Sequence, residues 1–151
     1  MDARFVNPFI AALSNVLPQM GFKNVVRGKL FSKDQFIDNQ GVLVNVQLTN
    51  NVTGNVAFTM TEESAKKLSS TIMMGMPVVQ FDAMAQSALC EMINIVTSNA
   101  AISLNKEGFG VSLVPPALSQ NTPKLKICNT NYIGIEMFID ELHVEVGIGM
   151  N

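Results

Sequence analysis

The chain has 151 residues, a net charge of −2, 48% apolar residues and only 15% charged residues. A chain of this length predicts one domain over residues 1–151 that needs no disulfide or metal to hold its core. With no run of basic residues, the composition argues against nucleic-acid binding. The charged fraction lies below the usual value of about 25%, which favours extra buried surface such as an oligomer interface.

The sequence also argues against export and against a metal site. Asp2 stands where a signal peptide carries positive charge, and Asn7 and Pro8 interrupt the apolar stretch that follows. No run of 18 uncharged apolar residues predicts a membrane span. Cys90 and Cys128 are isolated, so neither a zinc site nor a disulfide framework is expected. These features together predict a reduced, cytoplasmic protein.

The N-terminal part predicts a helix followed by strands. Apolar residues recur at helical spacing over residues 2–18, and Asp2 is suited to cap the helix. A short strand at a sheet edge is expected over residues 25–31. Residues 42–48 and 56–60 alternate with a period of two, which is typical of paired strands. The asparagines at 50–51 favour a hairpin turn, because asparagine tolerates left-handed backbone geometry.

Two helices are expected in the middle of the chain. Thr61 is a suitable N-cap for a helix that runs to about residue 74 and stops at Gly75. Asp82 is a suitable N-cap for a longer helix that reaches about residue 105. Both predictions rest on a capping side chain followed by apolar residues at helical spacing.

The last third returns to strands. Short strands are expected over residues 111–114 and 125–127, and longer ones over residues 133–139 and 142–148. The apolar parity changes across residues 140–141, which indicates a tight turn between antiparallel strands. This element order predicts an α+β fold with an antiparallel or mixed β-sheet covered by two long helices.

The predicted long helix has two distinct faces. At about 100° per residue, the core side gathers apolar residues, namely Ala85, Leu89, Met92, Ile93, Val96, Ala100 and Leu104. The opposite side carries a polar stripe of Ser87, Glu91, Asn94, Ser98 and Asn105. Three apolar residues border the stripe, as a docking surface requires: Met84, Ile95 and Ile102.

The polar stripe has both an ordinary and a functional interpretation. Exposed Glu and Asn side chains are common on the solvated face of an amphipathic helix. A carboxylate and a carboxamide one turn apart can also hold a water or bind a partner's polar groups. They supply no nucleophile and no metal site. His143 and Cys90 are interpreted as a surface histidine and a small apolar filler.

Several segments resemble one family. The opening seven residues, Met-Asp-Ala-Arg-Phe-Val-Asn, and the segment Thr71-Ile-Met-Met-Gly-Met are similar to those of CheX proteins. The spacing Ser87-x-x-x-Glu91-x-x-Asn94, with Pro115-Pro116 downstream, resembles the signature of the CheC/CheX/FliY family of chemotaxis phosphatases. A single Glu-x-x-Asn copy resembles the CheX branch. Ile93 and Ser98 depart from the glycines common in the family, and Ile93 falls on the predicted core face.

The resemblance implies a phosphatase acting on a CheY-like response regulator phosphorylated on aspartate. It implies that Asn94 orients the attacking water and that Glu91 engages a lysine of the regulator. It also implies a homodimer, no cofactor bound by this chain, and Mg²⁺ held by the partner. The expected partner contacts come from the remainder of the stripe, its apolar border and the proline pair, namely Ser87, Ser98, Met84, Ile95, Ile102, Pro115 and Pro116.

Two other functions remain open at this point. The chain could be a non-catalytic CheX-like module that docks on a response regulator or signalling protein and changes its assembly, an alternative that the departures at Ile93 and Ser98 support. It could also be a dimeric scaffold whose polar stripe is only solvated surface. Dependence of phosphate loss from the regulator on Asn94 separates the phosphatase from the docking module and the scaffold.

Overall fold

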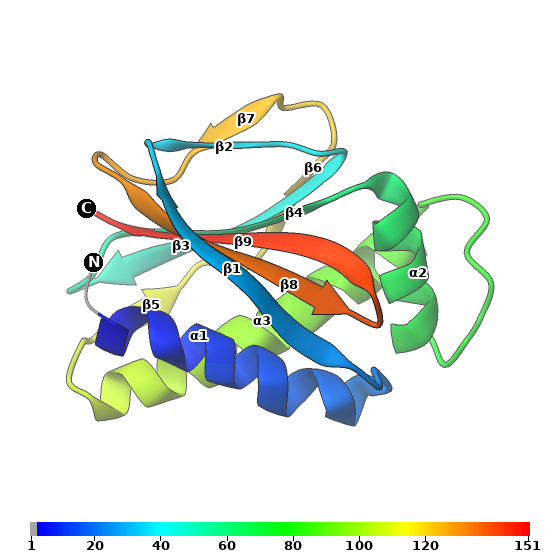
Figure 1. Ribbon diagram of the computed structural model, residues 1–151, viewed down its shortest axis with the longest axis horizontal. Helices are drawn as coiled ribbons and strands as arrows, with labels where there is room; N and C mark the ends of the chain where they lie inside the picture. Colours follow the sequence, from blue (N-terminus) through cyan, green and yellow to red (C-terminus); the bar gives the residue numbers. More distant parts are fainter. Residues whose placement is uncertain (1–2) are drawn as a thin grey trace.

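An antiparallel sheet forms the centre of the molecule (Figure 1). In this computed structural model, which describes residues 3–151, the strand order is β1-β8-β9-β4-β3-β5, and β6 also pairs with β3. The strands of this sheet are β1 (Val25–Lys33), β3 (Val42–Asn50), β4 (Gly54–Met60), β5 (Val111–Leu113), β6 (Ala117–Ser119), β8 (Tyr132–Ile139) and β9 (Leu142–Met150). The predicted α+β class is confirmed, with every strand pair antiparallel.

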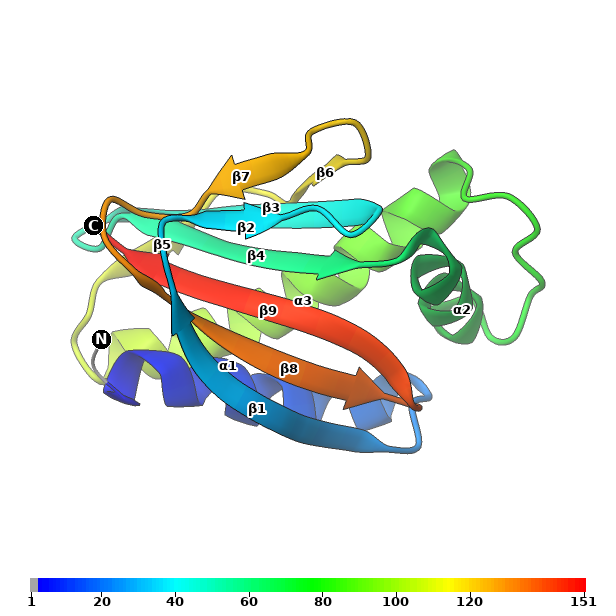
Figure 2. The same cartoon turned by 45° about the horizontal axis from the view of Figure 1, so that its top comes forward.

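Helices α1 (Ala3–Val16) and α3 (Ala83–Lys106) lie against one face of this sheet, while α2 (Glu62–Ile72) sits at one end (Figure 2). The first helix was predicted to reach residue 18. A 3₁₀ turn instead takes over at η1 (Leu17–Met20), and Gly21 ends it with φ of 103°. The predicted cap, Asp2, lies outside the described residues. None of the helices within residues 3–151 has the length and hydropathy to cross a membrane.

The main core lies between the helices and the sheet. The even-numbered side chains of β3 from Val42 to Leu48 point into it and are buried, as the period-two alternation predicts. Phe5 and Phe9 from α1 pack into the same core. Packing through this core therefore fixes the orientation of α3 relative to the sheet.

A second, smaller core on the opposite sheet face was not predicted. The strands β2 (Phe36–Asp38) and β7 (Lys124–Lys126) pair with each other and cover that face. Buried side chains beneath them form one cluster, made of Ile37, Leu43, Ala57, Ile127, Cys128 and Tyr132. Strands β2, β6 and β7 have three residues each, which is too short for a clear period-two pattern. Only β7 was anticipated.

The predicted turns are confirmed by the backbone. Asn50 adopts a φ of 79° at the β3–β4 turn, and Asp140 and Glu141 adopt φ of 49° and 69° at the β8–β9 turn. The Asp140 carboxylate also accepts hydrogen bonds from the backbone N–H groups of Lys23 and Asn24, at 2.9 and 2.8 Å. These bonds fix the start of β1 to the hairpin.

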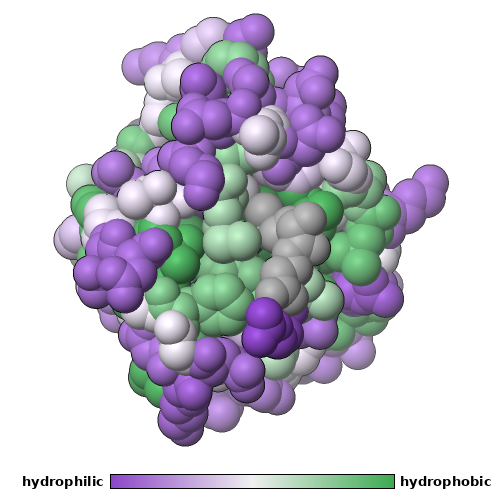
Figure 3. All heavy atoms as spheres, turned by 90° about the vertical axis from the view of Figure 1, so that its left-hand side faces the viewer, coloured by the Kyte–Doolittle hydropathy of each residue, from purple (hydrophilic) through white to green (hydrophobic). Residues whose placement is uncertain are grey.

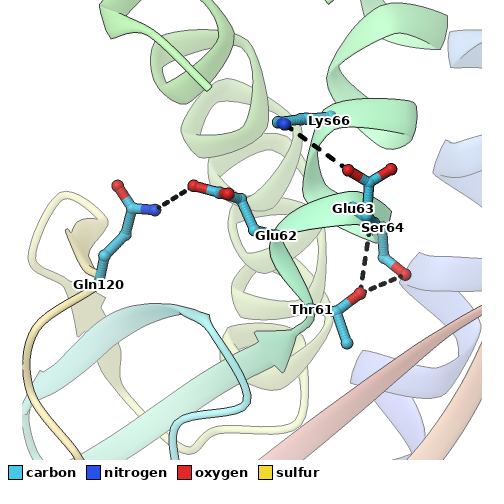
Figure 4. Close-up of polar contacts among 6 residues, drawn as sticks. All are labelled: Thr61, Glu62, Glu63, Ser64, Lys66 and Gln120. Atoms are coloured by element: carbon cyan, nitrogen blue, oxygen red, sulfur yellow. Dashed lines mark hydrogen bonds and ion pairs between the residues drawn. The ribbon is translucent and has the colours of Figure 1, made fainter. Parts of the chain in front are cut away.

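Polar contacts in the first turn of α2 connect the end of the sheet beside this helix to the loop after β6 (Figure 4). The Thr61 hydroxyl accepts from the Ser64 backbone N–H at 3.1 Å, which confirms its predicted capping role. The Gln120 amide nitrogen donates to the Glu62 carboxylate at 2.9 Å. Gln120 directly follows β6, so this bond ties the far end of that strand to α2.

Candidate functional site

The core face of α3 is as predicted. All seven residues assigned to its core face are buried, and Ile93, the departure from the family pattern, is completely so. Asp82 caps the helix, its carboxylate accepting from the Ala85 backbone N–H at 3.0 Å. Isoleucine at position 93, where the family commonly has glycine, therefore affects interior packing and does not alter the exposed face of α3.

Glu91 and Asn94 lie one helical turn apart on the outward side of α3. Glu91 is exposed and Asn94 is half-buried. Within residues 3–151, neither side chain forms a hydrogen bond or an ion pair; the only bond at Asn94 beyond the helix ladder is accepted by its backbone carbonyl. Both functional groups are consequently available to an external water or partner, and the helix backbone fixes their spacing.

Glu91 is also electrostatically isolated along the sequence. Between Lys67 and Lys106 the only charged residues are Asp82 and Glu91, and Asp82 is engaged as the helix cap. Between the capping Asp82 and Lys106 in its last turn, α3 thus carries Glu91 as its one charged side chain. Depletion of charge is typical of the centre of a protein interface, and a lone carboxylate there is suited to meet a cation brought by the partner.

Three exposed apolar side chains border one side of the polar stripe. Met84, Ile95 and Ile102 are 64%, 38% and 57% exposed. The other border of the stripe is formed by Thr97 and Ala101, which are buried. The stripe thus has an accessible apolar border on one side and packed structure on the other. The remaining predicted contacts, Ser87 and Ser98, flank the central pair and are exposed and half-buried.

Asn105, predicted to continue the stripe, serves the fold instead. Its amide nitrogen donates to the Val111 carbonyl at 3.0 Å, and its carbonyl oxygen accepts from the Val111 N–H at 2.6 Å. An amide that satisfies both groups of one residue is committed to holding that residue. The polar stripe is accordingly shorter than predicted and comprises Ser87, Glu91, Asn94 and Ser98.

Pro115 and Pro116 lie between β5 and β6, which run along the outer side of β3. Both short strands also contact α3. Pro115 is exposed and Pro116 is half-buried. Proline cannot donate to a strand ladder, so the pair interrupts this sheet edge and stiffens the segment beside α3.

His143 belongs to a separate polar group on the sheet face opposite α3. Its Nε2 lies 3.2 Å from the Glu136 carboxylate, and its ring packs edge-on against Phe138. The backbone N–H of Lys29 also donates to Glu136, at 3.2 Å, and this bond together with His143 lowers the pKa of that carboxyl group. Sequence reasoning placed His143 on the surface but missed Glu136 as its partner, because that contact depends on the β8–β9 register.

Neither cysteine has the surroundings of a reactive thiol. Burial raises the pKa of Cys90, and Cys128 lies in the second core cluster. A raised pKa means less thiolate at neutral pH, in accord with the interpretation of Cys90 as an apolar filler. Among residues 3–151, no three His, Cys, Asp or Glu side chains come together in a way that would hold a metal ion.

Comparison with known proteins places the whole arrangement in one family. The chain is 27% identical to the CheY-P phosphatase CheX of Thermotoga maritima, over 99% of each chain. It is similar to CheX in the CheX–CheY–BeF₃–Mg complex from Borrelia burgdorferi, with 26% identity, 97% coverage of each chain and a TM-score of 0.79. CheX from Vibrio vulnificus shares the fold, with 22% identity, coverage of 99% of this chain and 100% of that one, and a TM-score of 0.84. The family model described as chemotaxis phosphatase CheX matches residues 42–135, more than half of the sequence, so the chain belongs to the CheX family.

Proposed function

We propose that this chain is a phosphatase of a CheY-like response regulator phosphorylated on aspartate, and that α3 docks at the regulator's phosphorylation site. The observation that carries the proposal is the Glu91–Asn94 pair, which is accessible and has no partner among residues 3–151. The relatives support it: one is named a CheY-P phosphatase. Another is seen in complex with CheY, BeF₃ and Mg²⁺, where BeF₃ stands in for a phosphoryl group.

Asn94 is proposed to orient the attacking water. The water oxygen attacks phosphorus, the bond from phosphorus to the aspartyl oxygen breaks, and aspartate and inorganic phosphate are released. An aspartyl phosphate is already reactive, so positioning of the water is the main contribution that a second protein can make. The Asn94 carboxamide can accept from the water through Oδ1 while Nδ2 donates to a neighbouring oxygen. Mg²⁺ is expected in the regulator, where it neutralises phosphoryl charge.

Glu91 is proposed to pair with a lysine of the regulator and so set the pose of α3. A carboxylate approaching a phosphoryl group is repelled unless a cation lies between them. In this proposal Ser87 and Ser98 add polar contacts, while Met84, Ile95 and Ile102 form an apolar border. The stiff Pro115–Pro116 segment contacts the partner beside the helix.

A homodimer is proposed as the assembly. Val26 and Leu30 on the edge strand β1 are exposed, and an apolar groove of about 350 Å³ lies nearby between β1 and the start of α1. Figure 3 views the end of the molecule at which the chain termini lie, and apolar surface occupies the middle of this view. An exposed apolar strand edge is suited to pairing with a second copy. Sedimentation of wild-type and Leu30→Lys protein would test this assembly, since loss of the dimer is expected only in the variant.

The phosphatase is tested by the lifetime of the phosphoryl-aspartate on candidate regulators from the same organism, with Mg²⁺ and catalytic amounts of this chain. Asn94→Ala and Glu91→Ala are compared with Asn99→Ala, a matched control on the same helix outside the stripe. We expect Asn94→Ala to lower the acceleration of dephosphorylation by about a hundredfold or more. Asn99→Ala should accelerate dephosphorylation as much as wild type does. A fully active Asn94→Ala protein would overturn the proposed mechanism. Binding without acceleration by wild type would favour the docking module.

A further inference from the structure

The connection between α2 and α3 displays apolar side chains at the surface. Met74 is 96% exposed, Val79 is 82% exposed and Met76 is 54% exposed. These residues lie in a segment that we call the methionine loop, residues 73–79, which also contains Met73, Gly75, Pro77 and Val78. Side chains of this kind are ordinarily withdrawn from water, so their concentration in one loop indicates a contact surface.

Specific hydrogen bonds hold the methionine loop in this outward conformation. The Ser70 hydroxyl donates to the Met76 carbonyl at 2.8 Å, and the Gly75 N–H donates to the Ser70 carbonyl at 2.8 Å. Met74 adopts a φ of 62°, a left-handed backbone conformation that few non-glycine residues take up. The loop is therefore tied to the end of α2, and its methionines are fixed away from the core.

The methionine loop is continuous with the exposed face of α3. Met73, Met76, Pro77 and Val79 line an open groove of about 430 Å³ that also includes Met84 and the exposed polar residues Gln80 and Asp82. Met84 lies in the first turn of α3, where it begins the apolar border of the polar stripe. Apolar surface thus passes from the loop through Met84 to Ile95 and Ile102, with Asp82 at the groove and with Glu91 and Asn94 beside the helical part.

We propose that the methionine loop is the second part of the regulator-docking surface and receives an uncharged, apolar patch beside the regulator's phosphorylated aspartate. This inference rests on the proposed function. Area supports it, because the stretch from Met84 to Ile102 is about 27 Å long and 10 Å wide. Its footprint of about 270 Å² is a third of the roughly 800 Å² per partner in a stable interface. Adjoining surface must be buried too, and the methionine loop is apolar and adjacent.

The composition of the loop specifies the chemistry of the patch it receives. Residues 68–81 carry no charge, and the charged groups beside the loop, Asp82 in the groove and Glu63, Lys66 and Lys67 next to Val78 and Val79, lie at its margins. Over the loop itself, a strongly charged partner surface would therefore be desolvated without compensation. Methionine is flexible and polarisable, which lets one surface adapt to related apolar partners. The loop would therefore contribute affinity and choice of regulator, while Glu91 and Asn94 act at the phosphoryl group.

The test is a Met74→Lys/Val79→Lys variant, with Phe36→Lys as a matched control at an exposed apolar residue on β2, on the sheet face opposite α3. The dephosphorylation rate is measured against the concentration of phosphorylated regulator, and the Kd is measured for regulator loaded with BeF₃ and Mg²⁺. We expect the loop variant to raise KM and Kd about tenfold or more with kcat near wild type. Phe36→Lys should leave both constants unchanged.

The outcomes separate this inference from the proposed function. An active wild type with an unchanged Kd in the loop variant overturns the inference alone. A loop variant that becomes monomeric on sedimentation with an unchanged regulator Kd assigns the surface to a second copy of the chain and also overturns it. A wild type that accelerates no regulator, yet binds one through the loop, refutes the phosphatase and supports the docking role of the loop. A wild type that binds no regulator overturns both.

Discussion

Asn105 holds Val111 by both of that residue's backbone groups, across the turn that joins α3 to β5. This contact fixes the point after α3 at which the chain begins to run along β3 as β5 and β6. At the other end of this segment, Gln120 is bonded to Glu62 at the start of α2. The proline pair therefore lies in a segment anchored at both ends, and its position beside α3 does not depend on the prolines alone.

Replacement of Asn105 by alanine is expected to lower the free energy of unfolding by about 1–2 kcal/mol, because both polar groups of Val111 lose their partner. Urea denaturation measures the change. Asn99→Ala is the control, since that side chain is exposed and forms no hydrogen bond within residues 3–151. Equal stability of the two variants would show that the Asn105 contact does not hold the turn.

Introducing a charge at Ile102 is expected to weaken docking without harming the fold. Ile102 is 57% exposed, so Ile102→Glu costs little on folding, whereas it would bury an unpaired carboxylate in the proposed interface. The Kd for regulator loaded with BeF₃ and Mg²⁺ should rise about tenfold or more. Ser112→Glu, at an exposed position on β5, supplies the comparison. An unchanged Kd for Ile102→Glu would place the interface elsewhere.

Glu145 is expected to make the free energy of unfolding fall as the pH rises from the ordinary pKa of a glutamate to the raised pKa of this group. Burial of this half-buried carboxyl group raises its pKa above the ordinary 4.5, and this effect exceeds the opposite effect of Lys33 and His143. Between the ordinary and the raised pKa the folded protein binds more protons than the unfolded chain, so the free energy of unfolding decreases with pH across that window. Glu145→Gln should remove this decrease, as chemical denaturation at several pH values would reveal. A pH profile unaltered by the substitution would contradict the assignment.

Alanine at Gly54 is expected to be far more damaging than alanine at Gly108. Both glycines have left-handed φ, 152° and 89°. A Cβ at Gly54 would overlap the backbone carbonyl oxygen of Gly149 on β9, whereas a Cβ at Gly108 meets nothing within 4 Å. Gly108→Ala should cost about 1 kcal/mol of backbone strain, and Gly54→Ala more than about 2 kcal/mol. Thermal or urea unfolding of the two variants compares them directly.

Long elements with a clear period were predictable from the sequence. The alternation in β3, β4, β8 and β9 assigned their faces, and Thr61 and Asp82 marked the starts of α2 and α3. The three-residue strands β2 and β6 were not predictable, because their pairing depends on partners distant in the chain. The second core that β2 and β7 cover was missed for the same reason.

The central part of the candidate site was predictable, while its edges were not. Helical periodicity put Glu91 and Asn94 on the face opposite Ile93, and the structure places them there. Periodicity also put Asn105 on that face, but its amide turns to the following loop, where the backbone of Val111 needs a partner. The exposure of the methionine loop depends on the Ser70–Met76 hydrogen bond, which local spacing does not reveal.

Helix α3 supplies both core side chains and the candidate site, and this constrains the spacing of residues within it. Loss or gain of a single residue between Glu91 and Asn94 would rotate everything that follows by about 100°. Core side chains such as Val96 and Ala100 would leave the interior, and the carboxylate and the carboxamide would no longer share a face. Divergence of partner choice in such a scaffold must proceed by exchange of exposed side chains, with the residue count of the helix held constant.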